Sequence, residues 1–169
     1  NQKLLVVSDP FTHKAMGSRI FKNLKAKINV GEFIWEQPSS SIEGVQFLRT
    51  KLKDYDGMIA VGSGTVSDSI KYATFLEDKV YSVFATTPMN AYTTGTASIS
   101  FDGIKKSLVA HYAQGVFFDL EVLSNCPKRL TAAAFVDVIC RTTAQVDWLM
   151  SHKLLNTDYK TTPYELLAL

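Results

Sequence analysis

Short apolar runs alternate with longer stretches of helical periodicity along the first half of the chain. The runs end at turn residues and predict buried strands at 3–8, 32–36, 57–61 and 80–84. Between them, apolar residues recur every three or four positions, which predicts three helices. These helices are expected over 13–28 with Thr12 as the N-cap, from Ser39–Ser41 to about Leu52, and after Gly64. Strands separated by helices of this length predict an α/β fold, a parallel sheet with helices on both faces.

The pattern changes after about residue 95. Two strand-like runs, 97–101 and 104–109, flank Asp102-Gly103, and this dipeptide is a strong β-hairpin signal. One more strand is expected at 115–118, closed by Asp119.

The last part of the chain carries only helical signals. Residues 128–153 predict one continuous helix, with Pro127 placed near its start. We therefore expect an α/β domain over residues 1–124 and the beginning of an all-helical domain over residues 125–169. The apolar run 164–169 has no cap or polar tail and needs a surface to pack against, so we expect a truncated chain.

Composition narrows the class of protein. The 169 residues are 46% hydrophobic and 20% charged, which is typical of a soluble globular domain. No apolar stretch reaches the ~18 residues of a membrane-spanning helix. The net charge of +2 is spread along the chain, which argues against nucleic-acid or membrane surfaces. Cys126 and Cys140 have neither disulfide nor metal spacing, and no secretory signal is recognisable, so we expect a cytoplasmic protein.

The third strand leads into Gly62-Ser63-Gly64-Thr65 and then directly into a helix. A helix N-terminus leaves backbone N–H groups unpaired and carries partial positive charge, and glycine lets phosphate oxygens approach the backbone. The spacing of Thr65 and Asp68 predicts a capping box at this helix start. The turn therefore indicates either a phosphate site or a tight strand-to-helix turn that uses glycine for geometry alone.

The turn differs from two well-known phosphate motifs. The Rossmann fingerprint GxGxxG follows a first strand, and a P-loop continues into Gly-Lys-Ser/Thr. Neither pattern is present here. If a dinucleotide binds, its ribose needs a carboxylate from elsewhere, and Asp9 and Glu36 are the candidates. The alternative for Asp9 is a side chain that only starts the turn before Pro10.

A polar loop follows the fourth strand. Residues 86–96 include five threonines, one asparagine and one tyrosine. The carboxyl ends of parallel strands meet at one edge, so the loops after Ser8, Val61 and Ala85 should share a ligand crevice. The alternative is an ordinary polar surface loop.

Asp137 lies on a mostly apolar stripe of the long predicted helix. The stripe comprises Leu130, Ala134, Asp137, Arg141, Ala144 and Trp148. A carboxylate there needs a metal, a ligand hydroxyl or a cation as partner. Arg141 four residues on offers an ion pair worth about 0.3–0.5 kcal/mol. The three histidines show no spacing typical of a metal site.

Together these segments resemble the glycerol-1-phosphate dehydrogenases and iron-containing alcohol dehydrogenases of the dehydroquinate synthase-like superfamily. The stretches that carry the resemblance are Gly62–Lys71, Ala85–Ile99, Asp102–Lys106 and Asp119 through Trp148. The resemblance covers essentially the whole chain and implies a Rossmann-like nucleotide domain followed by an all-helical domain, with the catalytic site between them.

The resemblance also implies roles for single residues. NAD or NADP would place its diphosphate on Gly62, Ser63, Gly64, Thr65 and Val66, with Asp68 close by. The remaining cofactor contacts would be Asp9 at the adenosine ribose, and Thr86, Thr87 and Thr94. Asn90 would contact the substrate, and Asp137 would be the first ligand of a divalent metal such as Zn, Ni or Fe. This metal role replaces the ion pair with Arg141 as the expected role of Asp137.

Three departures from the family pattern stand out. Asn90 replaces a substrate-contacting carboxylate and therefore carries no charge. Ser63 interrupts a run of three glycines. Two histidine metal ligands of the family would lie beyond Leu169, and a catalytic zinc usually needs three protein ligands.

We therefore expect an NAD(P)-dependent, metal-dependent polyol phosphate dehydrogenase acting on a small ketone or polyol phosphate, with this chain alone supplying the cofactor-binding part. A homo-oligomer fits this interpretation. The alternatives are a nucleotide-binding module without catalysis and a cyclase similar to dehydroquinate synthase.

Overall fold

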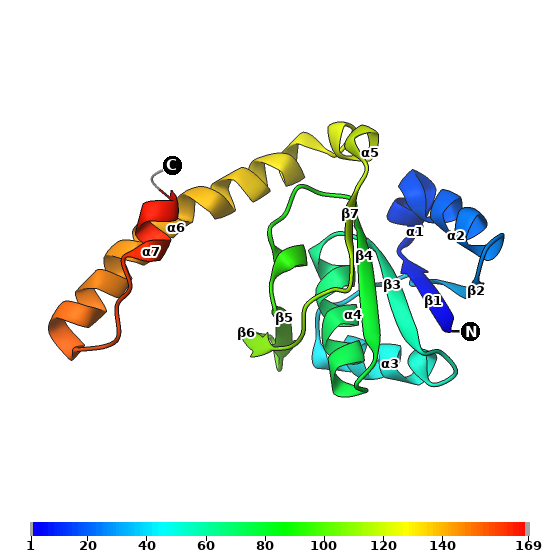
Figure 1. The fold of residues 1–169 in the computed structure, drawn as a ribbon, viewed down its shortest axis with the longest axis horizontal. Coiled ribbons are helices and arrows are strands. Elements are labelled where there is room, and N and C mark those ends of the chain that lie inside the picture. Colours follow the sequence, from blue (N-terminus) through cyan, green and yellow to red (C-terminus); the bar gives the residue numbers. More distant parts are fainter. Residues whose placement is uncertain (1, 168–169) are drawn as a thin grey trace. The chain divides into compact units, whose positions relative to one another are not determined.

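The computed structural model describes residues 2–167, which divide into two compact units, the first ending at Pro127 and the second beginning at Lys128. The first unit is built on a five-stranded parallel sheet (Figure 1). Its strands are β1 (Lys3–Ser8), β2 (Asn29–Ile34), β3 (Gly57–Gly62), β4 (Val80–Ala85) and β7 (Val116–Phe118). Their order in the sheet is β2-β1-β3-β4-β7. The predicted parallel sheet is confirmed.

Helices cover both faces of this sheet because alternate strand residues point to opposite sides. Leu5 and Val7 of β1 share a core with α3 (Ile42–Leu52) and α4 (Gly64–Leu76). Val6, between them in sequence, belongs to a second core with α2 (Ser18–Lys25) on the opposite face. The predicted α/β architecture is therefore confirmed, with a buried core on each side of the sheet.

The first helical segment begins earlier than the apolar pattern predicts. Its N-cap is Asp9, not Thr12, because the Asp9 carboxylate accepts hydrogen bonds from the amides of Phe11 (2.8 Å) and Thr12 (3.0 Å). Pro10 occupies the first helical position, where its missing N–H costs nothing. The segment continues as α1 (Pro10–Thr12), a single π-helical turn (His13–Gly17) and α2.

Strand β2 is also shifted, to Asn29–Ile34 from the predicted 32–36. Its position follows from pairing with β1, because Lys3 aligns with Asn29 and Ser8 with Ile34. The Trp35 amide then donates to the Ser8 carbonyl at 2.7 Å, just beyond the strand. Pairing with β1 fixes the register more firmly than local composition does.

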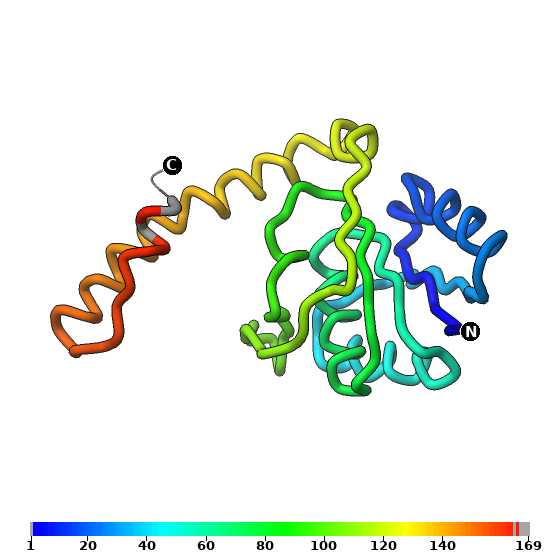
Figure 2. The backbone as a smooth tube through the Cα atoms, viewed as in Figure 1, coloured from blue at the N-terminus to red at the C-terminus, as the bar shows by residue number. Residues whose placement is uncertain are grey.

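Between β4 and β7 the chain leaves the sheet and returns to its edge (Figure 2). This excursion carries a short 3-10 turn (Ala91–Thr93) and the predicted hairpin of β5 (Thr96–Phe101) and β6 (Ile104–Val109). Asp102 and Gly103 both have positive φ, 49° and 79°, as a two-residue type I′ turn requires. Helix α5 (Leu120–Ser124) follows β7.

The second unit consists of α6 (Lys128–Leu155) and α7 (Thr162–Leu167). The Trp148 indole donates to the Asp158 carbonyl at 2.6 Å, which holds the connecting segment beside α6. The long predicted helix is thus present and extends two residues further. Residues 168 and 169 of the predicted apolar run lie outside the described residues. Among the helices described, none is long and apolar enough to cross a membrane.

Candidate functional site

The strand order puts the expected ligand crevice of this fold at one edge of the sheet. In a doubly wound sheet of order 2-1-3-4-5, ligands bind at the carboxyl ends of the strands where the winding direction reverses, here between β1 and β3. Ser8 of β1 aligns with Val61 of β3, and Gly62 aligns with Ala85 of β4. The structure therefore brings the loops after Ser8, Val61 and Ala85 to one edge, as predicted.

Helix α4 begins at this edge with unsatisfied backbone donors. Ser63 is its N-cap, but the Ser63 hydroxyl makes no capping hydrogen bond. The Ser67 amide donates to the Ser63 carbonyl at 3.0 Å. Helix geometry leaves the amides of Gly64, Thr65 and Val66 without an intrahelical acceptor. The first turn of α4 can therefore donate hydrogen bonds to an anion and stabilise its charge.

The predicted capping box between Thr65 and Asp68 is wrong. Asp68 is 8% exposed, and its carboxylate accepts from the Ser98 amide of β5 at 3.2 Å. Its other oxygen lies 3.6 Å from the ammonium of Lys71, one turn further along α4. Burial raises the pKa of Asp68 and lowers the pKa of Lys71, and each charge opposes the shift of its partner. Asp68 thus joins α4 to the hairpin.

The two glycines of the turn differ in whether the protein has room for a side chain. Neither has positive φ, so neither is needed for backbone conformation. A Cβ on Gly62 would lie 2.9 Å from Val66 Cβ, so the packing of the turn excludes a side chain there. A Cβ on Gly64 would meet only Met89, at an ordinary 3.5 Å. The fold explains Gly62 but not Gly64, and close approach of a ligand would explain Gly64.

Tyr92 ties the loop after β4 to the glycine turn. Its ring is fully buried, and its hydroxyl donates to the Gly62 carbonyl at 3.1 Å. Since that proton is used, the Thr87 hydroxyl is the donor in the 2.7 Å bond between Thr87 and Tyr92. Burial raises the pKa of Tyr92, which keeps the phenol protonated. The backbone adds a further link, from the Thr86 amide to the Gly62 carbonyl at 3.2 Å.

Replacing Tyr92 with phenylalanine should destabilise the first unit while leaving its core filled. The change removes one buried hydroxyl and leaves two buried partners short of a hydrogen bond, which costs about 1–3 kcal/mol. Denaturant unfolding measures the loss. Tyr112→Phe is the matched control, because Tyr112 is 71% exposed and the same atom is removed there. Equal unfolding free energies for the two variants would contradict the role of Tyr92.

The other predicted residues of this loop lie near the same edge. Thr86 and Thr87 are buried at the carboxyl end of β4, at 8% and 3% exposure. Asn90 is half-buried and begins the 3-10 turn, and Thr94 ends it. The Thr94 hydroxyl donates to the Ala91 carbonyl at 3.0 Å, so the turn has a defined shape.

Asp9 is the N-cap of α1 and stands at the same edge of the sheet as the glycine turn. It caps α1, which bears out the turn-starting role, and its second oxygen accepts from the Thr12 hydroxyl at 2.9 Å. It also stands directly after β1 and therefore beside the crevice. Glu36, the other carboxylate weighed for the ribose, is exposed.

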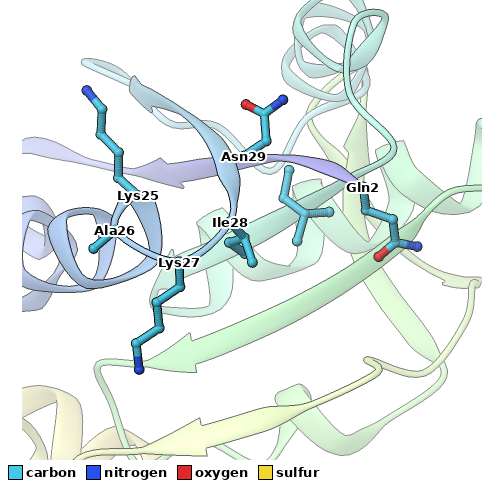
Figure 3. A pocket seen from close by; sticks show the side chains of 7 residues that line it. Gln2, Lys25, Ala26, Lys27, Ile28 and Asn29 are labelled. Carbon is cyan, nitrogen blue, oxygen red and sulfur yellow. The ribbon is translucent and has the colours of Figure 1, made fainter.

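A separate surface hollow lies at the opposite edge of the sheet (Figure 3). It is lined by residues at the start of β1, at the end of α2 and at the start of β2, among them Gln2, Lys25, Lys27 and Asn29. The side chains of Lys25 and Lys27 point in different directions (Figure 3), so they do not converge on one anion. The hollow is therefore distinct from the crevice.

Asp137 belongs to the second unit, where it lies exposed on α6. Within the described part of the chain, no three His, Cys, Asp or Glu side chains are grouped so that they could hold a metal ion. The residues present therefore do not make a metal site by themselves.

Two residues that organise the crevice, Lys71 and Tyr92, were not predicted from the sequence. A signal for Lys71 was available. It lies in α4 between the buried residues Ile70 and Ala73, and a lysine in such a place requires partners. Tyr92 gave no comparable signal, because one aromatic residue in a polar loop does not indicate what its hydroxyl contacts.

In doubly wound α/β domains, unpaired helix amides at the switch point of the sheet are an arrangement suited to phosphate-bearing ligands. The chain belongs to the iron-containing alcohol dehydrogenase family, whose model matches residues 1–127. A glycerol-1-phosphate dehydrogenase [NAD(P)+] of Geobacillus thermodenitrificans is 28% identical over 98% of the chain and 43% of its own length. The enzyme of the same name from Pyrococcus horikoshii is 32% identical over 89% of the chain and 44% of its own length.

Solved structures agree on the fold. Glycerol dehydrogenase from Schizosaccharomyces pombe matches with a TM-score of 0.72 at 20% identity, over 82% of this chain and 36% of that one. An iron-containing alcohol dehydrogenase from Thermotoga maritima matches with a TM-score of 0.71 at 18% identity, over 82% and 45% of the two chains. The chain thus spans less than half the length of each of these relatives.

Proposed function

We propose that this chain is the cofactor-binding part of an NAD(P)-dependent polyol phosphate dehydrogenase, most similar to glycerol-1-phosphate dehydrogenase. The observation that carries the proposal is the uncapped start of α4 at the switch point, with Gly64 free of any internal need for glycine. Relatives with this stretch of sequence are named for NAD(P)+ and glycerol 1-phosphate, which supports the choice of ligand.

In the proposed complex the dinucleotide lies across the carboxyl ends of β1, β3 and β4. Its diphosphate accepts hydrogen bonds from the amides at Gly64, Thr65 and Val66, and Gly62 and Ser63 shape the approach. Asp9 accepts from the adenosine ribose, since a carboxylate retains lone pairs beyond those used in capping. Three threonines border the remaining part of the cofactor: Thr86, Thr87 and Thr94.

The proposed reaction reduces a ketone phosphate such as dihydroxyacetone phosphate to the secondary alcohol. NAD(P)H, when bound, supplies the hydride. Asn90 contributes a neutral amide that can donate to and accept from a substrate hydroxyl. The buried hydroxyls of Thr87 and Tyr92 fix the loop that carries Asn90, so substrate and cofactor meet in one orientation.

A divalent metal belongs to the proposal for the complete enzyme, with Asp137 as one of its ligands. The described residues do not assemble a ligand set around Asp137. Its single carboxylate is too few ligands for a catalytic metal, which usually takes three from the protein. Asp68 is proposed to act near the cofactor only indirectly, through its contacts with Lys71 and β5.

We further propose a cytoplasmic homo-oligomer whose partner is a small phosphorylated ketone or polyol. Both described cysteines are free, which fits a reducing compartment. Charges of both signs are interspersed and sum to +2, which does not favour nucleic acid.

The proposal is tested with a protein that carries this chain and extends to the length of its relatives. With dihydroxyacetone phosphate as substrate, NADH absorbance is followed during the reaction, and the product is analysed after the reaction is stopped. We expect one NADH oxidised for each glycerol phosphate formed. Conversion of a sugar phosphate, offered in place of dihydroxyacetone phosphate, without net NADH change would favour a cyclase, and NADH binding without turnover of either substrate would favour a non-catalytic module.

A further inference from the structure

Lys71 is a fully buried lysine whose ammonium is used entirely inside the protein. Its Nζ donates to the carbonyls of Ala91 at 2.7 Å and Thr96 at 2.8 Å. A third, longer contact reaches the Thr94 hydroxyl at 3.4 Å. These partners begin and end the segment 91–96, so one side chain of α4 closes this segment into a loop.

The buried charge is compensated locally. Asp68 lies 3.6 Å from Nζ and also accepts from the Ser98 amide, just beyond the segment that Lys71 holds. The pair therefore anchors residues 91–98 to α4 from within. Burying an ammonium is costly unless it is paired and hydrogen-bonded, so this arrangement persists only because all its donors find acceptors.

Further anchors of the segment lie on the hairpin side, where the Gly95 carbonyl accepts from the Ala110 amide at 2.8 Å and Thr96 pairs with Val109. Apart from Tyr92, which is fully buried, its residues before Ala97 are half-buried or exposed. Tyr92 holds the beginning of the segment to Gly62, and Lys71 holds both of its ends. Asn90 immediately precedes the segment, and its carbonyl accepts from the Thr93 amide within it at 3.3 Å, so these internal contacts contribute to the position of Asn90.

We propose that Lys71 is a positioning residue that sets the substrate side of the crevice by fixing segment 91–96 and, with it, Asn90. This inference rests on the function proposed above, because it assigns Asn90 to the substrate. Helix α4 then serves both halves of the site. Its first turn binds the cofactor diphosphate, and Lys71, two turns along, orients the loop that meets the substrate.

The test compares Lys71→Met with Lys79→Met in the complete enzyme. Lys79 is a matched control, because its Nζ also donates to two carbonyls, those of Leu52 at 3.0 Å and Tyr55 at 2.7 Å. Those carbonyls belong to the last residue of α3 and to the loop before β3, at the opposite end of the strands from the crevice. The double variant Asp68→Asn/Lys71→Met serves if an unpaired Asp68 carboxylate prevents folding.

Amide exchange, KM and Kd together distinguish the anchoring of segment 91–96 from its role toward substrate. For Lys71→Met or the double variant we expect amide exchange in segment 91–96 to accelerate at least about tenfold. We expect KM for dihydroxyacetone phosphate to rise at least about tenfold, while Kd for NADH rises no more than about threefold, because Thr94 is the one residue of the segment placed beside the cofactor. For Lys79→Met, exchange in 91–96, KM and Kd should all stay within about twofold of the unmodified enzyme.

Unchanged exchange in 91–96 would overturn the anchoring role of Lys71. Faster exchange with unchanged KM, or equal KM changes in the Lys71 and Lys79 variants, would overturn its role toward substrate. Failure of the unmodified enzyme to bind NADH would instead overturn the proposed function, and the exchange data would show separately whether Lys71 holds the loop.

Discussion

Replacing Gly64 with alanine should weaken NADH binding by about 10- to 100-fold while leaving the fold intact. The new methyl group would stand where the diphosphate approaches, and one charge-assisted hydrogen bond is worth about 1.5–3 kcal/mol. Inside the protein the same methyl meets only Met89 at 3.5 Å. Alanine also favours a helical first turn, so the unfolding free energy should stay equal or rise by about 0.5 kcal/mol. Calorimetric titration and denaturant unfolding measure the two effects.

Gly62→Ala is the control variant for Gly64→Ala, because it changes the packing of the turn as well as the approach of the cofactor. Its Cβ would lie 2.9 Å from Val66 Cβ, so the turn must shift to admit it. We expect this variant to lose about 1–3 kcal/mol of stability together with affinity. If Gly64→Ala instead lost stability and kept its affinity, glycine would serve the geometry of the turn alone.

Replacing Asp9 with asparagine should change the choice between the two dinucleotides. The carboxylate beside the ribose would repel the 2′-phosphate of NADP, and the neutral amide would not, so preference for NAD should fall by about tenfold or more. Asparagine caps helices about as well as aspartate, so α1 should remain in place. Kd values for NADH and NADPH, measured side by side, give the ratio.

Asp9→Ala provides the control for capping. It removes the acceptor for the amides of Phe11 and Thr12 and should cost about 1 kcal/mol of unfolding free energy. An unchanged NADH-to-NADPH ratio in Asp9→Asn would confine Asp9 to its capping role.

Most of the fold could be predicted because its signals are local. Buried strands and amphipathic helices repeat with clear periods, and Asp102-Gly103 fixes the hairpin. Two boundaries were missed. Strand β2 is placed by its long-range register with β1. The first helix is placed by the Asp9 side chain, for which the local pattern indicates a turn before Pro10 but not a helix N-cap.

The site could be predicted only in part, for a physical reason. Backbone features such as the glycine turn are visible in sequence because they need particular residue types. Side-chain contacts across the fold are not, since Asp68 and Thr65 have capping-box spacing while Asp68 actually faces Lys71 and β5. Tyr92 reaches Gly62 across 30 positions of sequence, and no local pattern encodes such a contact.

The proposed function rests on binding of the cofactor diphosphate by the first turn of α4. A crystal structure of this protein with NADH measures the position of that diphosphate directly. We predict phosphate oxygens within about 3 Å of the backbone nitrogens at the first turn of α4, Gly64 to Val66. A dinucleotide bound with its diphosphate away from these amides would contradict the proposed cofactor site.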